Sequence, residues 1–274
     1  MEETTYGDKR RLEFVRRVIE ITQPRLVLDI GCGTGMRVTR PLAAAFPAIR
    51  FVGTDPDRTS IGWASDHNRD LENLSFVCLG TALPDERFDL VIASEVIEHL
   101  YEPIKLLHDI RDRLSEKGRI VLTLPNGYGP SELMALTECI LYLSGVQMVL
   151  RRLKYLWRGR SMPVAPQDRD TLAISPHVNF FSFREIVRLF SEAGLHVVRA
   201  TNRSILCGYI LDDLISSPHL IALNVRFADR MPTWCVSDWM FELEPVRPIV
   251  RSHWRRGNWA RFRKWLNERR WRIA

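Results

Sequence analysis

The feature that most restricts the fold of this chain is a glycine-rich turn near its N-terminus, Gly31-Cys32-Gly33-Thr34-Gly35. The apolar run at 25–28 before the turn is typical of a buried strand, and the pattern at 36–46 after it favours a helix. Glycines let the backbone approach a ligand without Cβ clashes, and open α/β sheets bind nucleotides where a strand leads into such a turn. The stretch therefore predicts a nucleotide-binding cradle.

The acid before the turn indicates the kind of nucleotide. A dinucleotide fingerprint reads G-x-G-x-x-G and places a pyrophosphate at the helix N-terminus. This chain reads G-x-G-x-G, with Met36 where the last glycine would stand and Asp29 just before the turn. A carboxylate there would repel a pyrophosphate but suits a ligand that carries an ammonium and a sulfonium, and S-adenosylmethionine (SAM) is such a ligand. The residues expected to hold it here are Asp29, Gly31, Cys32, Gly33 and Gly35.

Strand and helix patterns alternate through the first half of the chain. Strand-like runs lie near 26–30, 50–54, 75–79, 88–93 and 119–124, with a helical pattern at 8–22 and others between the strands. This alternation predicts a parallel, doubly wound sheet, whose ligands bind at the carboxyl ends of the strands. The polar residues at the predicted strand ends are Asp29, Asp55, Ser94 and Asn126. Later patterns predict helices at 182–193 and 211–229 and strands at 195–201 and 237–243.

Five segments together resemble the class I SAM-dependent methyltransferases. They are 28–35, 51–55, 88–100, 118–126 and 177–195, and they follow one another in the order expected of that family. The last is similar to the late segment of ubiquinone-biosynthesis-type and related small-molecule and glycan methyltransferases. The resemblance covers roughly residues 10–245 and implies a Rossmann-like α/β fold with a seven-stranded, mostly parallel sheet. It also implies a methyltransferase domain at 1–245, with a helical lid at 127–176 inserted after strand five to build the acceptor pocket.

The resemblance implies roles for further residues around SAM. Asp55 stands 20 positions after Gly35, close to the spacing of a ribose-binding acid, with Pro56 directly behind it; the pair Asp55-Pro56 could also begin a helix. Family members often carry an adenine-reading acid after strand three, but none precedes Asp85 here, so Thr81 is the candidate. Ser94 and Glu95 are expected to bound the methionine end of SAM.

A cluster of acids and a histidine is the candidate for catalysis. At helical spacing Glu95, Glu98 and His99 can share one face. His99 is mostly neutral at pH 7 and can accept the proton of a hydroxyl as it attacks the methyl group, which makes O-methylation of a small-molecule, glycan or lipid-linked acceptor the expected reaction. Alternatively, His99 only caps the helix.

Other functions use the same residues. Glu95, Glu98, His99 and His177 resemble the two-acid, two-histidine metal site of small-RNA 3′-end 2′-O-methyltransferases, although we expect no metal. That resemblance implies a metal-dependent RNA 2′-O-methyltransferase as one alternative, and methylation of nitrogen or carbon is another. A SAM-binding, membrane-associated interaction protein without turnover is the alternative outside enzymes.

Charge divides the chain into a body and a tail. The segment 246–274 holds ten of the 39 basic residues but one of the 33 acids, which leaves 29 basic and 32 acidic residues in the body. Overall charge therefore gives no argument for a nucleic-acid partner. The tail also carries Trp254, Trp259, Trp265 and Trp271 among its arginines. Such a composition fits an anionic membrane surface, an RNA backbone or a helix packed on the body.

Cysteines and apolar runs bear on where the protein works. The five cysteines are scattered without C-x-x-C spacing, which indicates a reducing compartment, and the acidic start predicts no secretory signal. The apolar stretch at 133–150, followed by a basic patch at 151–160, is read as a lid helix over an apolar acceptor pocket or as a helix lying in a membrane interface. We therefore expect a cytoplasmic protein, with peripheral membrane association as an option.

Overall fold

The fold is built on a seven-stranded sheet. A computed structural model describes residues 6–80, 83, 85–146, 176–205, 223–224, 226–246 and 255–271. The strands are β1 (Leu26–Ile30), β2 (Arg50–Asp55), β3 (Leu74–Cys78), β4 (Phe88–Ser94), β5 (Leu114–Pro125), β6 (Leu195–Asn202) and β7 (Asp238–Pro245), in the order β3-β2-β1-β4-β5-β7-β6. Only β7 runs antiparallel to its neighbours β5 and β6, so the predicted mostly parallel, seven-stranded sheet is confirmed.

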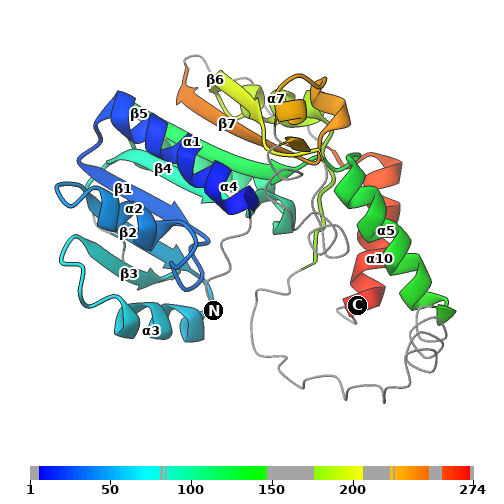
Figure 1. Ribbon diagram of the computed structural model, residues 1–274, viewed down its shortest axis with the longest axis horizontal. Coiled ribbons are helices and arrows are strands. Elements are labelled where there is room, and N and C mark those ends of the chain that lie inside the picture. The colour runs from blue at the N-terminus through cyan, green and yellow to red at the C-terminus, as the bar shows by residue number, and fades with distance from the viewer. Residues whose placement is uncertain are drawn as a thin grey trace.

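Helices cover both faces of this sheet (Figure 1). They include α1 (Tyr6–Thr22), α2 (Thr39–Ala45), α3 (Arg58–His67), α4 (Pro103–Arg113) and α7 (Phe183–Glu192). Successive strand residues point to opposite faces: Val27 packs with Val18 of α1 and Leu42 of α2 in one buried cluster, while Leu28 belongs to a second cluster with Leu107 of α4 and Leu189 of α7. The sheet is therefore the middle layer of a three-layer sandwich, as a doubly wound fold requires.

Local sequence signals set the ends of two helices. Ser182 accepts from the Glu185 backbone N–H and the Glu185 carboxylate accepts from the Ser182 backbone N–H, which is a capping box at the start of α7. Asp57 likewise accepts from the backbone N–H groups of Thr59 and Ser60 and begins α3. The predicted helix at 211–229 falls mostly outside the described residues.

Two further helices project beyond the end of β5 (Figure 1). They are α5 (Pro130–Leu143), which belongs to the predicted lid, and α10 (Asn258–Trp271), which belongs to the basic tail. They pack side by side, and α10 turns Ala260, Arg263 and Leu266 into the body. Of the three interpretations of the tail, the structure therefore favours a helix packed on the body for the side of α10 that carries these three residues. Among the residues that are described, no helix combines the length and the apolar character needed to span a bilayer.

Candidate cofactor and acceptor site

The glycine turn has the backbone shape of a ligand cradle. Gly31, Gly33 and Gly35 all have positive φ angles, of 71°, 54° and 73°. A Cβ on Gly31 would lie 2.5 Å from the Val96 side chain, and one on Gly35 would lie 2.5 Å from the Phe76 ring. A Cβ on Gly33, in contrast, would meet no atom within 4 Å. The turn is thus pressed against the protein on two sides and open at Gly33, where a ligand can approach the backbone.

Asp55 at the end of β2 closes the second side of the cradle. Its Oδ2 accepts from the Gly33 backbone N–H at 2.9 Å, and its Oδ1 accepts from the Asp57 backbone N–H at 2.9 Å. Each oxygen keeps a lone pair, so the carboxylate can still accept from sugar hydroxyls. Pro56 follows directly and is exposed, whereas Thr81 lies outside the described residues. The structure therefore joins Asp55 to the glycine turn, and its expected contact with the ribose stays a prediction.

Asp29 lies beneath the turn rather than in it. Its carboxyl is almost fully buried and accepts a hydrogen bond of 2.6 Å from the Thr39 hydroxyl. Burial raises the pKa of Asp29 to about 7, against the lowering effects of Thr39 and of Arg11. A cationic group bound above it would favour the carboxylate. Burial also raises the pKa of the Cys32 thiol, which keeps this thiol neutral at physiological pH.

The predicted helical face at 95–99 is wrong. Glu95 has a φ of 56°, and only the short 3₁₀ turn Ile97–His99 follows it. The Glu95 carboxylate accepts from Arg203 at 2.9 Å and from the Thr123 hydroxyl at 2.8 Å. Burial acts to raise its pKa, but Arg203 and Arg11 outweigh it and lower the pKa below its usual value. The left-handed backbone, fixed by these tertiary contacts, turns Glu95 away from the face that a helix would have given it.

The segment still lies beside the cradle. Ser94 ends β4 next to β1, and its buried hydroxyl has no hydrogen-bond partner among the described residues. Val96 is the residue against which Gly31 packs. The residues on either side of Glu95 thus lie beside β1 and the turn, and the expected contact of Ser94 and Glu95 with the methionine end of SAM stays a prediction.

Glu98, His99 and His177 form a compact cluster next to this segment. One potential ligand atom from each lies within 4.8 Å of the others, and His99 Nε2 is 3.9 Å from Glu98 Oε1. Glu98 is 1% exposed, and neither of its carboxylate oxygens has a hydrogen-bond partner in the described part of the chain. Leaving a buried carboxyl group without a partner costs free energy, which marks this as a place for a ligand.

The three groups differ in protonation. Burial, with the neighbouring Glu95, raises the pKa of Glu98 to about 8. Burial, with the cationic His177, lowers the pKa of His99 to about 4. For His177, burial is outweighed by the Glu132, Glu98 and Glu95 carboxylates, which raise the pKa to about 9. At pH 7 the cluster therefore holds a neutral carboxyl, a neutral imidazole and an imidazolium.

The tail helix supplies a buried ion pair that the sequence analysis missed. Arg263 of α10 donates to the Glu132 carboxylate at 2.8 Å, and the other Glu132 oxygen lies 2.6 Å from His177 Nδ1. Asn267 of α10 also donates to the His177 backbone oxygen at 3.0 Å. A signal existed: Arg263 stands between Ala260 and Leu266 at helical spacing, so an arginine occupies the apolar side of α10. The tail therefore helps to form this site.

The cluster also fits a divalent metal ion. The Nδ1 atoms of His99 and His177 lie 3.3 Å from the Pro176 oxygen and 2.6 Å from the Glu132 carboxylate, so each can donate there and leave its Nε2 for a metal. Histidine ligands in metal sites are oriented by such outer contacts. With a Glu98 oxygen, two nitrogens and one carboxylate would be available, which suits a first-row transition metal. Glu95 is engaged by Arg203 and is not part of this set.

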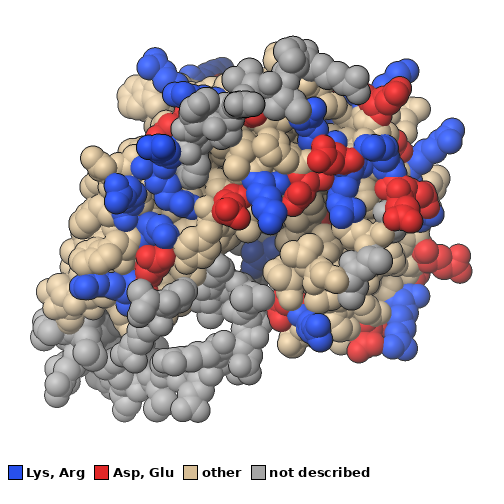
Figure 2. Space-filling view, turned by 180° about the vertical axis from the view of Figure 1, so that it is seen from behind, with Lys and Arg blue, Asp and Glu red and all other residues tan. Residues whose placement is uncertain are grey.

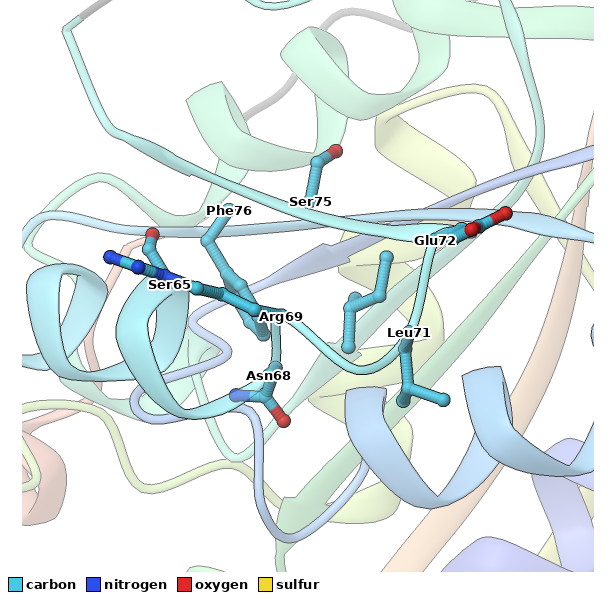
Figure 3. Close-up of a pocket in the computed structure, with 8 residues that line it drawn as sticks. Ser65, Asn68, Arg69, Leu71, Glu72, Ser75 and Phe76 are labelled. Carbon is cyan, nitrogen blue, oxygen red and sulfur yellow. The ribbon is translucent and has the colours of Figure 1, made fainter.

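A shallow hollow lies on another part of the surface. It has a volume of about 300 Å³ and lies between the end of α3 and the start of β3, with Asn68, Arg69 and Phe76 among its lining residues (Figure 3). Phe76, whose ring packs against Gly35, connects this hollow to the back of the glycine turn. The other lining residues come from α3 and from the residues up to the middle of β3, and they include none of the residues expected to hold SAM.

Comparison with known proteins identifies the family. A family model described as a methyltransferase domain matches residues 6–200. The ubiquinone biosynthesis O-methyltransferase of Bradyrhizobium diazoefficiens is 32% identical over 129 residues, which cover 46% of this chain and 47% of that protein. The tRNA U34 carboxymethyltransferase of Shewanella oneidensis is 31% identical over 126 residues, which cover 44% and 37%. The chain thus spans about half the length, or less, of these curated relatives.

Solved structures agree on the fold. The plantazolicin methyltransferase BpumL, solved with a triazolic desmethylPZN analog and SAH, superposes with a TM-score of 0.53 at 15% identity, over 89% of this chain and 87% of that one. PKMT2 from Rickettsia typhi, solved with AdoHcy, gives 0.53 at 16% identity, over 83% and 50%. The sheet order, the glycine turn with Asp55, and the family match over most of the chain lead to one conclusion: this protein belongs to the SAM-dependent methyltransferase family, with SAM as its cofactor.

Proposed function

We propose that this methyltransferase transfers the methyl group of SAM to a hydroxyl oxygen of a small-molecule, glycan or lipid-linked acceptor. The observation that carries the proposal is the neutral imidazole of His99 beside the buried Glu98, next to the border of the cofactor cradle. A hydroxyl must lose its proton as its oxygen attacks carbon, so an oxygen acceptor needs such a base. The similarity to a ubiquinone biosynthesis O-methyltransferase supports the same choice.

Different residues of the chain bind SAM and accept the proton. The glycine turn and Asp55 hold the adenosine part of SAM, Asp29 attracts its positive charge, and Ser94 borders its methionine end. SAM supplies an activated methyl group whose carbon–sulfur bond breaks as the new carbon–oxygen bond forms. His99 takes the hydroxyl proton on Nε2, because its Nδ1 is held by the Pro176 carbonyl. Alignment of the hydroxyl with the methyl group contributes to the rate alongside proton transfer, which adds on the order of 10²–10⁴-fold.

The proposal is tested with labelled SAM and a panel of acceptors. Purified full-length protein is incubated with catechols, polyprenyl phenols, glycans and lipid-linked sugars, and with amine and thiol analogues of the best acceptor. Transfer to hydroxyls, with the label recovered as a methyl ether, supports the proposal. Transfer to amines or carbon alone contradicts it.

A second candidate is metal-assisted transfer to vicinal hydroxyls, as in an RNA 3′ end or a catechol. The unpartnered Glu98 with two histidines favours it. A chelator would then abolish transfer, a divalent ion would restore it, and Glu98→Gln would lose metal binding measured by calorimetry. Unchanged transfer in the chelator leaves the metal-free mechanism with His99 as the base.

A further inference from the structure

The solvent side of α10 combines cations with aromatic rings. Because a helix repeats every 3.6 residues, Arg261, Phe262, Trp265 and Arg269 share one face, opposite the side that packs on the body. Phe262 is 46% exposed and Trp265 is 45% exposed. This set of four residues is called here the outer face of α10. It is not used by the fold or by the cofactor site.

The rings of Phe262 and Trp265 contact each other, and Phe262 also contacts Trp259 on the adjoining side of the helix. The ring centroids of Trp259 and Phe262 are 5.9 Å apart, and those of Phe262 and Trp265 are 6.1 Å apart. The Arg269 guanidinium lies 4.1 Å from the centroid of the Trp265 ring. A contiguous exposed aromatic patch of this kind, rimmed by charge, is typical of an interaction surface.

A groove runs along the same helix and is lined mainly by cations. It has a volume of about 540 Å³, and its lining residues are Arg255, Arg256, Arg261, Lys264, Trp265 and Glu268. Within the groove, Lys264 pairs with Glu268 at 3.4 Å and Arg256 donates to the Tyr101 backbone oxygen at 2.7 Å. In the described part of the chain, no ion pair involves Arg255 or Arg261. The groove thus holds positive charge that these residues leave uncompensated, and it suits phosphate groups.

Helix α5, which packs against α10, adds exposed aliphatic side chains. Leu133, Ile140 and Leu143 are all exposed, and Arg270 of α10 lies over the ring of the exposed Tyr142. Figure 2 shows blue side chains outnumbering red ones along the edge of the molecule that these two helices form. Since α5 leaves the end of β5, this edge is close to the candidate acceptor site. The two helices therefore expose apolar, aromatic and cationic side chains, with Ile140 and Tyr142 on different sides of α5.

We propose that the outer face of α10, with the exposed residues of α5, docks on an anionic phospholipid surface. Lipid phosphates neutralise the groove, Trp265 and Phe262 enter the boundary between headgroups and acyl chains, and the aliphatic residues of α5 lie beside them. Charge complementarity selects anionic lipid, and the aliphatic residues favour a membrane over RNA, which would stack on rings but leave Leu133 and Ile140 exposed. Docking on a membrane does not depend on the proposed reaction. If that reaction holds, docking favours a lipid-linked acceptor among the proposed classes.

The test is co-sedimentation of the full chain with vesicles. Phosphatidylcholine vesicles with about one third phosphatidylglycerol should bind the protein, and pure phosphatidylcholine should bind it far less. Binding should fall when salt rises from about 0.1 M to about 1 M, which shortens the Debye length from about 10 Å to about 3 Å. The triple variant Arg255→Gln, Arg261→Gln, Arg269→Gln should bind on the order of 100-fold more weakly, since each basic residue near the surface contributes about fivefold.

A matched control removes the same charge elsewhere. The exposed residues Arg17, Arg113 and Lys117, changed together to Gln, should keep vesicle binding within a few fold. SAM binding by calorimetry reports separately on folding and on the proposed function, and it should persist in both triple variants. Equal binding by wild type and the α10 variant overturns the docking surface, as does absence of binding to anionic vesicles. Tight binding to a short RNA without vesicle binding also overturns it, while SAM binding and methyl transfer could still stand.

Discussion

Arg263 of α10 makes two hydrogen bonds to Glu132 of α5, one to its carboxylate at 2.8 Å and one to its backbone oxygen at 2.7 Å. The guanidinium is 2% exposed, also donates to the Gly127 oxygen, and lies 4.0 Å from the centroid of the Phe180 ring. A charge buried so deeply is stable only while its partners are in place. Helices α10 and α5 therefore form one unit.

Replacing Arg263 with Met should destabilise the protein. The substitution leaves the Glu132 carboxylate buried with His177 as its remaining charged partner, so the free energy of unfolding should fall by about 3–5 kcal/mol. Urea unfolding followed by circular dichroism measures it. Arg261→Met on the same helix is the matched control, and because Arg261 is exposed it should change stability by less than about 0.5 kcal/mol. Equal stability of the two variants would show that the ion pair is not needed for folding.

Replacing Asp55 with Ala should weaken SAM binding. The carboxylate is expected to bind the ribose hydroxyls and is seen to hold the Gly33 backbone, so about 1–3 kcal/mol of binding free energy should be lost. Isothermal calorimetry with SAM and its demethylated product measures the loss. Asp66→Ala, which removes an exposed acid from α3 that pairs with Arg69, is the control. Unchanged affinity in Asp55→Ala, or tight binding of NAD, would contradict the assignment of the cradle.

The regular part of this fold is readable from sequence. Strand β1 matches the strand predicted near 26–30, and the Ser182 to Glu185 spacing marks the start of α7. These signals are local, because a strand's alternation and a capping box depend on neighbouring residues. The glycine turn and Asp55 are also predictable, since the fold carries the ends of adjacent parallel strands to one edge.

The acceptor side is less predictable because it depends on distant contacts. The backbone of Glu95 is held in the left-handed region by partners on β5 and after β6, so helical spacing gives the wrong geometry. Arg263 and Glu132 are 131 positions apart, and no local pattern joins them. The tail could be recognised as basic and aromatic from its composition. That Arg263 and Asn267 of the tail lie beside Glu132 and His177 follows from the packing of α10 on α5, which composition does not reveal.

Stability should depend on pH through the cluster around His177. The pKa of His177 is raised from 6.5 to about 9, so its stabilisation is complete below pH 6.5 and is lost as pH rises towards 9. The pKa of Glu98 is raised from 4.5 to about 8. Ionisation of this buried carboxyl therefore also lowers stability as pH rises, beginning at a lower pH than the loss through His177. With a chelator present, Tm should therefore fall between pH 6.5 and pH 9. The fall in Tm should be smaller in the His177→Gln variant than in the wild type. An equal fall in Tm in the two proteins would show that other groups cause the pH dependence.

His99 gives the sharpest test of the chemistry. In His99→Gln, turnover on the true acceptor should fall at least tenfold, because a positioned base contributes on the order of 10²–10⁴-fold, while SAM affinity should stay within a few fold. His196→Gln, which alters an exposed histidine on β6, should retain full turnover. The pH profile adds an independent readout. Since the pKa of His99 is lowered to about 4, the imidazole stays neutral well below pH 6.5, and the acid limb of kcat/KM should lie near pH 4 to 5. A wild-type profile that loses activity at pH 6.5, or a His99→Gln variant with full turnover, would make His99 a structural residue and remove it as the base.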